Sequence, residues 1–169
     1  AYHYPGPAAV RYPRGAGIGA AIKEELTSIE IGKGEVKRQG KDVAILAFGS
    51  MVAPSMGAAN ELNATVANMR FVKPLDVELV KKLAEDHACF VTVEEGATMG
   101  GAGAAVAEAM AAAGIVKPLL ILGLPDKFID QGDPAALLVS VGLDAKGIAA
   151  SIRARFGAAG EPRLVVNNT

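Results

Sequence analysis

Four short, mainly apolar stretches recur along the chain, and each has the length of a β-strand. A run of this kind indicates a strand that is buried on both faces of a sheet. The first run stops at Gly49 and Ser50, which are residues typical of turns. The pattern therefore predicts strands over residues 43–48, 65–69, 89–93 and 118–122.

Segments with helical spacing separate these strands. Residues 51–62 are expected to be helical, with the helix proper starting near Pro54. Residues 103–113 form an alanine-rich segment that predicts another helix, which ends before Gly114. A further helix should open at residues 74–76, because four apolar residues after them share one helical face. These residues are Leu79, Val80, Leu83 and Ala84.

The last part of the chain carries clear helix-start signals. Asp133 is a favourable N-cap before Pro134 at the first helical position, and Gly142 is expected to end that helix. Asp144 should cap a second helix. Its buried side is predicted from apolar residues spaced four apart, namely Ile148, Ile152 and Phe156.

Strands that alternate with helices imply right-handed crossovers and a largely parallel sheet. Residues 35–38 can reach Val43 through a tight turn, which predicts an antiparallel edge strand. The predicted fold class is therefore α/β, a three-layer sandwich with a mixed, mostly parallel sheet. Residues 31–157 are expected to form this domain.

The two ends of the chain do not fit this unit. Residues 1–15 include a β-prone run at 7–12, and we interpret them as the end of a preceding domain. Residues 16–30 have the composition of a linker, and residues 158–169 form a polar tail. Because Ala1 is not Met and no signal pattern follows it, we expect any targeting segment to lie upstream.

Composition narrows the function classes. The 17 Lys and Arg residues balance 18 Asp and Glu residues to a net charge of −1, which excludes a broad basic surface for nucleic acid or membrane lipid. Cys89 is the one cysteine, so no disulfide framework is possible. Two distant histidines exclude a Cys/His zinc site, and no unbroken apolar run has the length needed to span a bilayer.

The glycine-rich loop 96–103 lies between a predicted strand and a predicted helix, where phosphate groups often bind. The dinucleotide fingerprint fails, however, because Val106 stands where glycine or alanine is required. We therefore favour a tight turn that lets the following helix lie close to the sheet.

The titratable residues nearby are explained by structural roles. Glu94 and Glu95 are adjacent in a strand, so they point to opposite faces and are poorly placed as a paired acid and base. A structural role, such as accepting backbone N–H bonds from the glycine loop, is favoured. His87 is explained by the dipole at a helix end, and Cys89 as a small core residue.

Arg11 and Arg14 flank Pro13 near the amino end, and Gly15 follows. Guanidinium groups suit bidentate binding of phosphate or carboxylate, so this segment is a candidate anion site. From spacing alone, ordinary surface or inter-domain ion pairs explain the two arginines equally well.

Several longer motifs resemble one enzyme family. Arg11-Tyr12-Pro13-Arg14-Gly15 and residues 123–128 (Gly-Leu-Pro-Asp-Lys-Phe) are specific to it, whereas Lys73-Pro74-Leu75-Asp76 and Glu94-Glu95-Gly96 are shared among transketolase-type carboxyl domains. Together with residues 2–4, 31–34, 69–72 and 99–103, they closely resemble the carboxyl-terminal portion of the 1-deoxy-D-xylulose-5-phosphate synthase family of transketolase-like enzymes. The resemblance covers all but about the last dozen residues and implies a transketolase carboxyl-terminal-domain-like fold.

The resemblance implies an activity for the whole polypeptide. Family members condense pyruvate with glyceraldehyde 3-phosphate to form 1-deoxy-D-xylulose 5-phosphate and CO2, a precursor of isoprenoids, thiamine and pyridoxal. They are cytoplasmic homodimers that use thiamine diphosphate and Mg²⁺. The cofactor motifs belong to the two preceding domains, so this chain is expected to hold no catalytic, cofactor-binding or metal-binding residue and to be inactive alone.

One substrate-binding residue carries over by resemblance. Arg14 matches the arginine that binds the phosphate of glyceraldehyde 3-phosphate, whereas Arg11 matches a position with an expected structural role. The family's third domain, which residues 31–157 resemble, serves mainly stability and dimerisation. The alternative hypothesis is a non-catalytic interaction or dimerisation module, or the carboxyl domain of a 2-oxoacid dehydrogenase β subunit.

Overall fold

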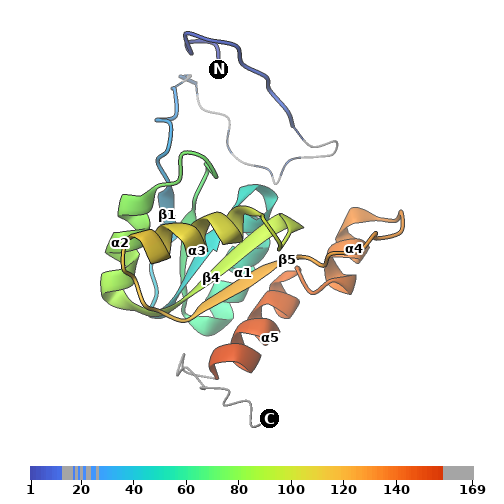
Figure 1. Cartoon of the computed structure of the whole chain (residues 1–169). Helices are drawn as coiled ribbons and strands as arrows, with labels where there is room; N and C mark the ends of the chain where they lie inside the picture. Colours follow the sequence, from blue (N-terminus) through green and yellow to red (C-terminus); the bar gives the residue numbers. More distant parts are fainter. Residues whose placement is uncertain (13–16, 18, 20, 22–23, 26, 158–169) are drawn as a thin grey trace.

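The computed structural model describes residues 1–12, 17, 19, 21, 24–25 and 27–157. Its five strands form one sheet in the order β1-β3-β2-β4-β5, with β1 antiparallel to β3 and the other pairs parallel (Figure 1). The strands are β1 (Glu35–Arg38), β2 (Asp42–Ala47), β3 (Thr65–Asn68), β4 (His87–Ala97) and β5 (Leu119–Leu124). The helices are η1 (Gly49–Met51), α1 (Val52–Leu62), α2 (Val77–Asp86), α3 (Ala102–Ala112), α4 (Pro134–Ser140) and α5 (Ala145–Phe156).

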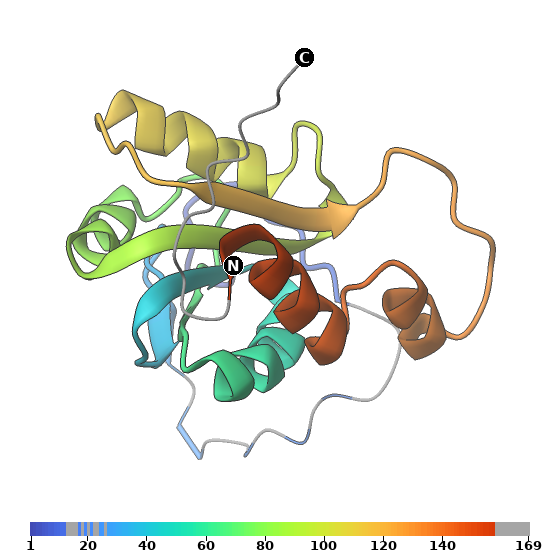
Figure 2. The ribbon, with the colours of Figure 1, turned by 90° about the horizontal axis from the view of Figure 1, so that it is seen from below.

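The predicted three-layer sandwich is confirmed. Helices α1 and α5 cover one face of the sheet, and α2 and α3 cover the other (Figure 2). The alternation of side chains along β2 explains the two cores, because Ile45 belongs to the same apolar cluster as Phe156 on one face and Leu46 to the same cluster as Val106 on the other. All four side chains are fully buried.

Strand β1 is the antiparallel edge strand that was predicted, but the tight hairpin to β2 does not form. The chain instead crosses the amino end of β3. There the backbone N–H of Gly40 donates to Oγ1 of Thr65 at 2.9 Å, and the N–H of Lys41 donates to the carbonyl of Asn63 at 2.7 Å. This crossing leaves β2 in the interior of the sheet, where its apolar side chains are covered on both faces.

Two element boundaries differ from the prediction for local reasons. Helix α1 begins at Val52, and Pro54 lies in its first turn, where a backbone N–H needs no intrahelical partner. Strand β4 runs beyond the apolar stretch as far as Ala97. Its last residues pair irregularly with β5, since the register shifts between Val93 and Ala97.

By length and composition alone, Pro134–Phe156 is apolar enough to cross a membrane, which the sequence pattern did not reveal. The structure divides this stretch into α4 and α5, with Gly142 in a left-handed conformation (φ 71°) between them. The predicted caps are confirmed: Asp133 accepts the N–H of Ala136 at 2.9 Å, and Asp144 accepts that of Gly147 at 3.0 Å.

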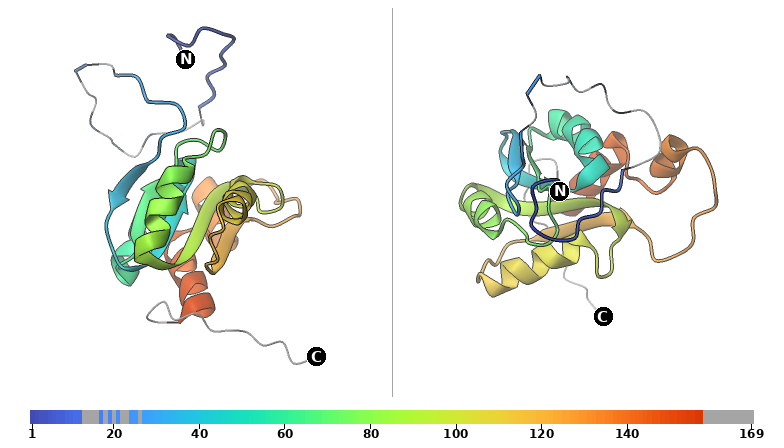
Figure 3. Two further views of the ribbon diagram at one scale, coloured as in Figure 1. Left: turned by 60° about the vertical axis from the view of Figure 1, so that its left-hand side comes forward. Right: turned by 90° about the horizontal axis from the view of Figure 1, so that it is seen from above.

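The described amino-terminal residues lie across the carboxyl ends of the parallel strands (Figure 3). The β-prone run at 7–12 is exposed and forms no strand with this sheet. Its pairing with a preceding domain, and the domain boundaries at residues 15, 30 and 157, stay predictions. Residues 158–169 lie outside the described part of the chain.

Cys89 is a core residue, as predicted, and its thiol is shielded from solvent. Burial raises the pKa of the thiol from its ordinary value near 9 to about 11, and the Asp42 carboxylate adds to the rise. At pH 8 the folded protein therefore holds about one thiolate in a thousand. We expect thiol reagents to label Cys89 slowly in buffer and rapidly in urea, and equal rates would contradict this.

The same shift makes stability depend on pH. The unfolded chain loses the thiol proton near pH 9, whereas the folded chain keeps it to about pH 11. The contribution of the protonated Cys89 thiol to folding stability is therefore fully present below pH 9 and is lost as the pH rises from 9 to about 11. The free energy of unfolding of the parent should fall through this range by roughly 1 to 3 kcal/mol more than that of Cys89→Ala.

Candidate functional site

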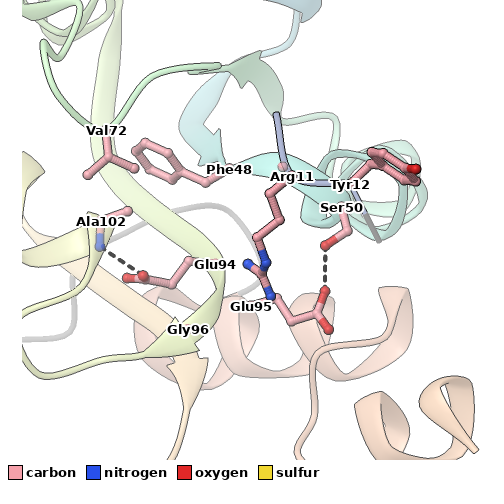
Figure 4. Close-up of a pocket in the computed structure, with 10 residues that line it drawn as sticks. Arg11, Tyr12, Phe48, Ser50, Val72, Glu94, Glu95, Gly96 and Ala102 are labelled. Carbon is pink, nitrogen blue, oxygen red and sulfur yellow. Dashed lines mark hydrogen bonds between the residues drawn. The ribbon is translucent and has the colours of Figure 1, made fainter. Parts of the chain in front are cut away.

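A cavity of about 530 Å³ opens at the carboxyl edge of the sheet (Figure 4). Strands β2 and β4 are parallel neighbours, so their ends meet at this edge, where open α/β sheets commonly bind ligands. The amino-terminal segment forms the opposite wall. The lining residues are Arg11, Tyr12, Phe48, Gly49, Ser50, Val72, Glu94, Glu95, Gly96 and Ala102.

Glu94 has the structural role that was predicted for it. Its side chain is buried, and both carboxylate oxygens accept backbone bonds from the start of α3. Oε2 accepts the N–H of Ala102, and Oε1 accepts the N–H of Gly103, each at 2.8 Å. Since the N-cap Gly101 has no side chain for this purpose, Glu94 caps α3 from the neighbouring strand.

The glycine loop is the close-packed turn that was favoured from sequence. A Cβ on Gly103 would lie 2.5 Å from Cγ2 of Ile121 and 2.5 Å from Oγ1 of Thr92, so only glycine lets α3 rest on the sheet. A Cβ on Gly101 would overlap the Glu94 carboxylate. Because Glu94 occupies the N–H groups at the helix start, a phosphate does not fit this loop.

Glu95 points to the other side of β4 and is exposed to the cavity. The hydroxyl of Ser50, at the start of η1, donates to its Oε2 at 2.5 Å. The predicted separation of Glu94 and Glu95 onto opposite faces is therefore confirmed. Sequence reasoning missed Ser50, because its only signal is that it follows a strand next to the one that carries Glu95.

Arg11 extends into the same cavity from the amino-terminal segment (Figure 4). Its guanidinium and the Glu95 carboxylate line one space, but the ion pairs of the described residues do not include one between these two side chains. Arg14, the predicted phosphate ligand, lies outside the described residues. Its role therefore stays a prediction.

His87 is buried, and its ring bonds at both nitrogens. Nδ1 lies 2.8 Å from the Leu83 carbonyl and Nε2 lies 2.6 Å from Oγ1 of Thr65. A carbonyl only accepts, so Nδ1 carries a proton and its hydrogen bond caps the end of α2. The dipole explanation was incomplete: this histidine also joins α2 to the start of β3.

The described residues do not fit thiamine diphosphate or its metal. Within the described ranges, no group of three or more His, Cys, Asp or Glu side chains is arranged to hold a metal ion. The helix start that could take a diphosphate is occupied by the Glu94 carboxylate.

Comparisons with known proteins find relatives that share this α/β domain. The family model for the C-terminal domain of transketolase matches residues 32–148. The chain is 63% identical over 166 residues to a 1-deoxy-D-xylulose-5-phosphate synthase of Cupriavidus metallidurans, which covers 95% of this chain and 26% of that protein. A protein of the same name from Paraburkholderia phymatum is 62% identical over 92% of this chain and 26% of its own length.

A solved structure shares the fold. It is a split-gene transketolase in the form of an inactive β4 tetramer, with a TM-score of 0.72 and 35% identity over 81% of this chain and 45% of that one. The chain spans about a quarter of the length of the curated relatives it matches. The resemblance read from the motifs is confirmed, and the family model covers well over half of the residues: the chain belongs to the transketolase C-terminal domain family.

Proposed function

We propose that this chain is the carboxyl-terminal portion of a 1-deoxy-D-xylulose-5-phosphate synthase. The observation that carries the proposal is the 63% identity over 95% of the chain to a protein of that name. The lower identity of 35% to a split-gene transketolase disfavours a general transketolase-type module. In the proposed reaction, pyruvate and glyceraldehyde 3-phosphate give 1-deoxy-D-xylulose 5-phosphate and CO2.

The rest of the polypeptide would hold thiamine diphosphate and Mg²⁺, because the residues described in this chain do not fit them. The chain alone is then inactive. We further propose that the whole enzyme is a cytoplasmic homodimer, as the family resemblance implies, and that its product feeds isoprenoid, thiamine and pyridoxal synthesis.

Within this function, the chain contributes a binding group for the aldose phosphate. Arg14 is the fourth residue of the Arg-Tyr-Pro-Arg-Gly segment and lies between Pro13 and Gly15 in the sequence. A guanidinium offers a planar fork of donors that matches a phosphate, and its charge does not titrate near neutral pH. Arg11, the neighbouring described residue of that segment, lines the cavity at the sheet edge.

Replacing Arg14 with alanine in the whole enzyme tests the proposal. Loss of the charge-assisted contact should weaken binding of glyceraldehyde 3-phosphate by about 2 kcal/mol, a rise of about thirty-fold in its KM. Pyruvate carries no phosphate, so its KM should stay unchanged. Steady-state kinetics with each substrate varied in turn measures both values.

Two variants complete this experiment. Arg14→Lys should recover part of the loss, because a point charge replaces the fork. Arg153→Ala is the matched control, since Arg153 forms an exposed ion pair with Glu61 at 3.0 Å, on α5 and α1. A KM for glyceraldehyde 3-phosphate that is the same in Arg14→Ala and the parent would refute the phosphate assignment.

A further inference from the structure

The cavity brings together two segments that are far apart in the sequence. Arg11 and Tyr12 form the wall contributed by the amino-terminal segment, and Glu95 and Ser50 form part of the wall at the sheet edge (Figure 4). Arg11 leads directly into the segment that carries Arg14. The sheet edge is therefore in a position to hold the amino-terminal segment at Arg11.

The Glu95 carboxylate is built to face this cavity. The Ser50 hydroxyl holds its Oε2 at 2.5 Å, which fixes the orientation of the group and leaves Oε1 as an acceptor. The neighbouring carboxylate of Glu94 points toward the start of α3, where it is satisfied by two backbone N–H groups. Across the described ranges, no ion pair compensates the charge of Glu95.

Arg11 carries the complementary charge in the same cavity. Among the described residues its guanidinium forms no ion pair, although it has five donors. Opposite charges that share a cavity attract, and the attraction grows when a neighbouring domain excludes water from them. Closure of this pair would anchor the segment at Arg11.

We infer that Glu95, oriented by Ser50, is a positioning residue that binds the guanidinium of Arg11 and so confines the substrate-binding segment to the sheet edge. Arg14 is three positions after Arg11, so covalent geometry keeps its Cα atom within about 10 Å of the Cα atom of an anchored Arg11. The effect on binding of the aldose phosphate rests on the proposed function, whereas the contact between Glu95 and Arg11 is independent of it.

Trypsin cleavage after Arg11 tests the contact in this chain. Trypsin must take the Arg11 side chain into its own pocket. The peptide bond after Arg11 should therefore be cut slowly while Glu95 holds the guanidinium. Glu95→Gln removes the charge but keeps an acceptor for Ser50, and it should raise the cleavage rate about two- to five-fold, as for loss of an exposed ion pair, when followed by mass spectrometry. The control is Glu108→Gln, an exposed position on α3. Equal rates in the two variants would overturn the inference.

Kinetics of the whole enzyme tests the consequence. Glu95→Gln and Arg11→Gln should each raise the KM for glyceraldehyde 3-phosphate about three- to ten-fold, with kcat and the KM for pyruvate unchanged. The double variant should be no worse than either single one, and exchanging the two charges (Glu95→Arg with Arg11→Glu) should restore part of the affinity. A merely structural role would instead lower thermal stability and affect both substrates.

The outcomes separate the two proposals. If Arg14→Ala raises the KM for the aldose phosphate but Glu95→Gln does not, the positioning role is wrong. Additive effects of the Glu95 and Arg11 variants would also overturn it. If Arg14→Ala has no effect, the proposed phosphate site fails, and the trypsin experiment still decides whether Glu95 binds Arg11.

Discussion

Replacing Glu94 with alanine is expected to lower the free energy of unfolding by roughly 3 to 5 kcal/mol, because it leaves two buried backbone donors without an acceptor at a cost of about 1 to 3 kcal/mol each. The N–H groups of Ala102 and Gly103 lose their partner oxygens, and α3 has no acidic residue in its first turn to replace them. A cavity beneath the helix start adds to the loss. Urea denaturation followed by circular dichroism measures it.

The adjacent glutamate supplies a control for this experiment. Glu95 is exposed and bonds only to the hydroxyl of Ser50 among the described residues, so Glu95→Ala should cost less than about 1 kcal/mol. The free energy of unfolding of Glu94→Gln should lie between those of Glu94→Ala and Glu95→Ala. The amide keeps one acceptor oxygen but points an NH2 donor at the other backbone N–H. If Glu94→Ala is as stable as Glu95→Ala, the capping role is wrong.

The elements of the fold were predictable where the signal is local. An N-cap and its helix lie within four residues, so Asp133 and Asp144 could be recognised from sequence and both accept the expected N–H bonds. The buried strands were recognisable because residues such as Ile45 and Leu46 face two cores and both must be apolar.

The pairing of β1 was not predictable from the same signals. Chain proximity favours a hairpin with β2, but the choice of β3 depends on contacts with residues more than twenty positions away. One is the bond from Gly40 to Thr65, and another is the bond from the Arg38 guanidinium to the Ala64 carbonyl at 2.6 Å. No periodicity in the sequence records such contacts.

The candidate site also combines features that local sequence signals predict with features that depend on distant residues. The structural role of Glu94 followed from its place at a strand end beside a glycine loop. The bond between Ser50 and Glu95 required the strand order, because only the parallel pairing of β2 with β4 brings these residues together. The cavity wall formed by Arg11 could not be derived from spacing, which left an anion site and an ion pair as equal alternatives.

Replacing Gly40 with alanine should destabilise the protein by about 4 kcal/mol or more, since the added methyl group meets rigid backbone instead of movable side chains. A Cβ at this position would overlap the carbonyl oxygen of Asn63 and the carbonyl carbon of Ala64, and it would lie 2.5 Å from the Ala64 oxygen. Relief requires the crossing segment to move away from β3, which breaks the bond from Gly40 to Thr65.

The loss should appear first in β1, because this edge strand pairs with β3 alone. Hydrogen exchange of the backbone amides over Glu35–Arg38 should accelerate in Gly40→Ala before the rest of the sheet opens. Gly17→Ala is the matched control, since a Cβ there meets nothing within 4 Å and should change the free energy of unfolding by less than about 0.5 kcal/mol. Equal stability of the two variants would show that the chain does not pass close to Asn63 and Ala64 at Gly40.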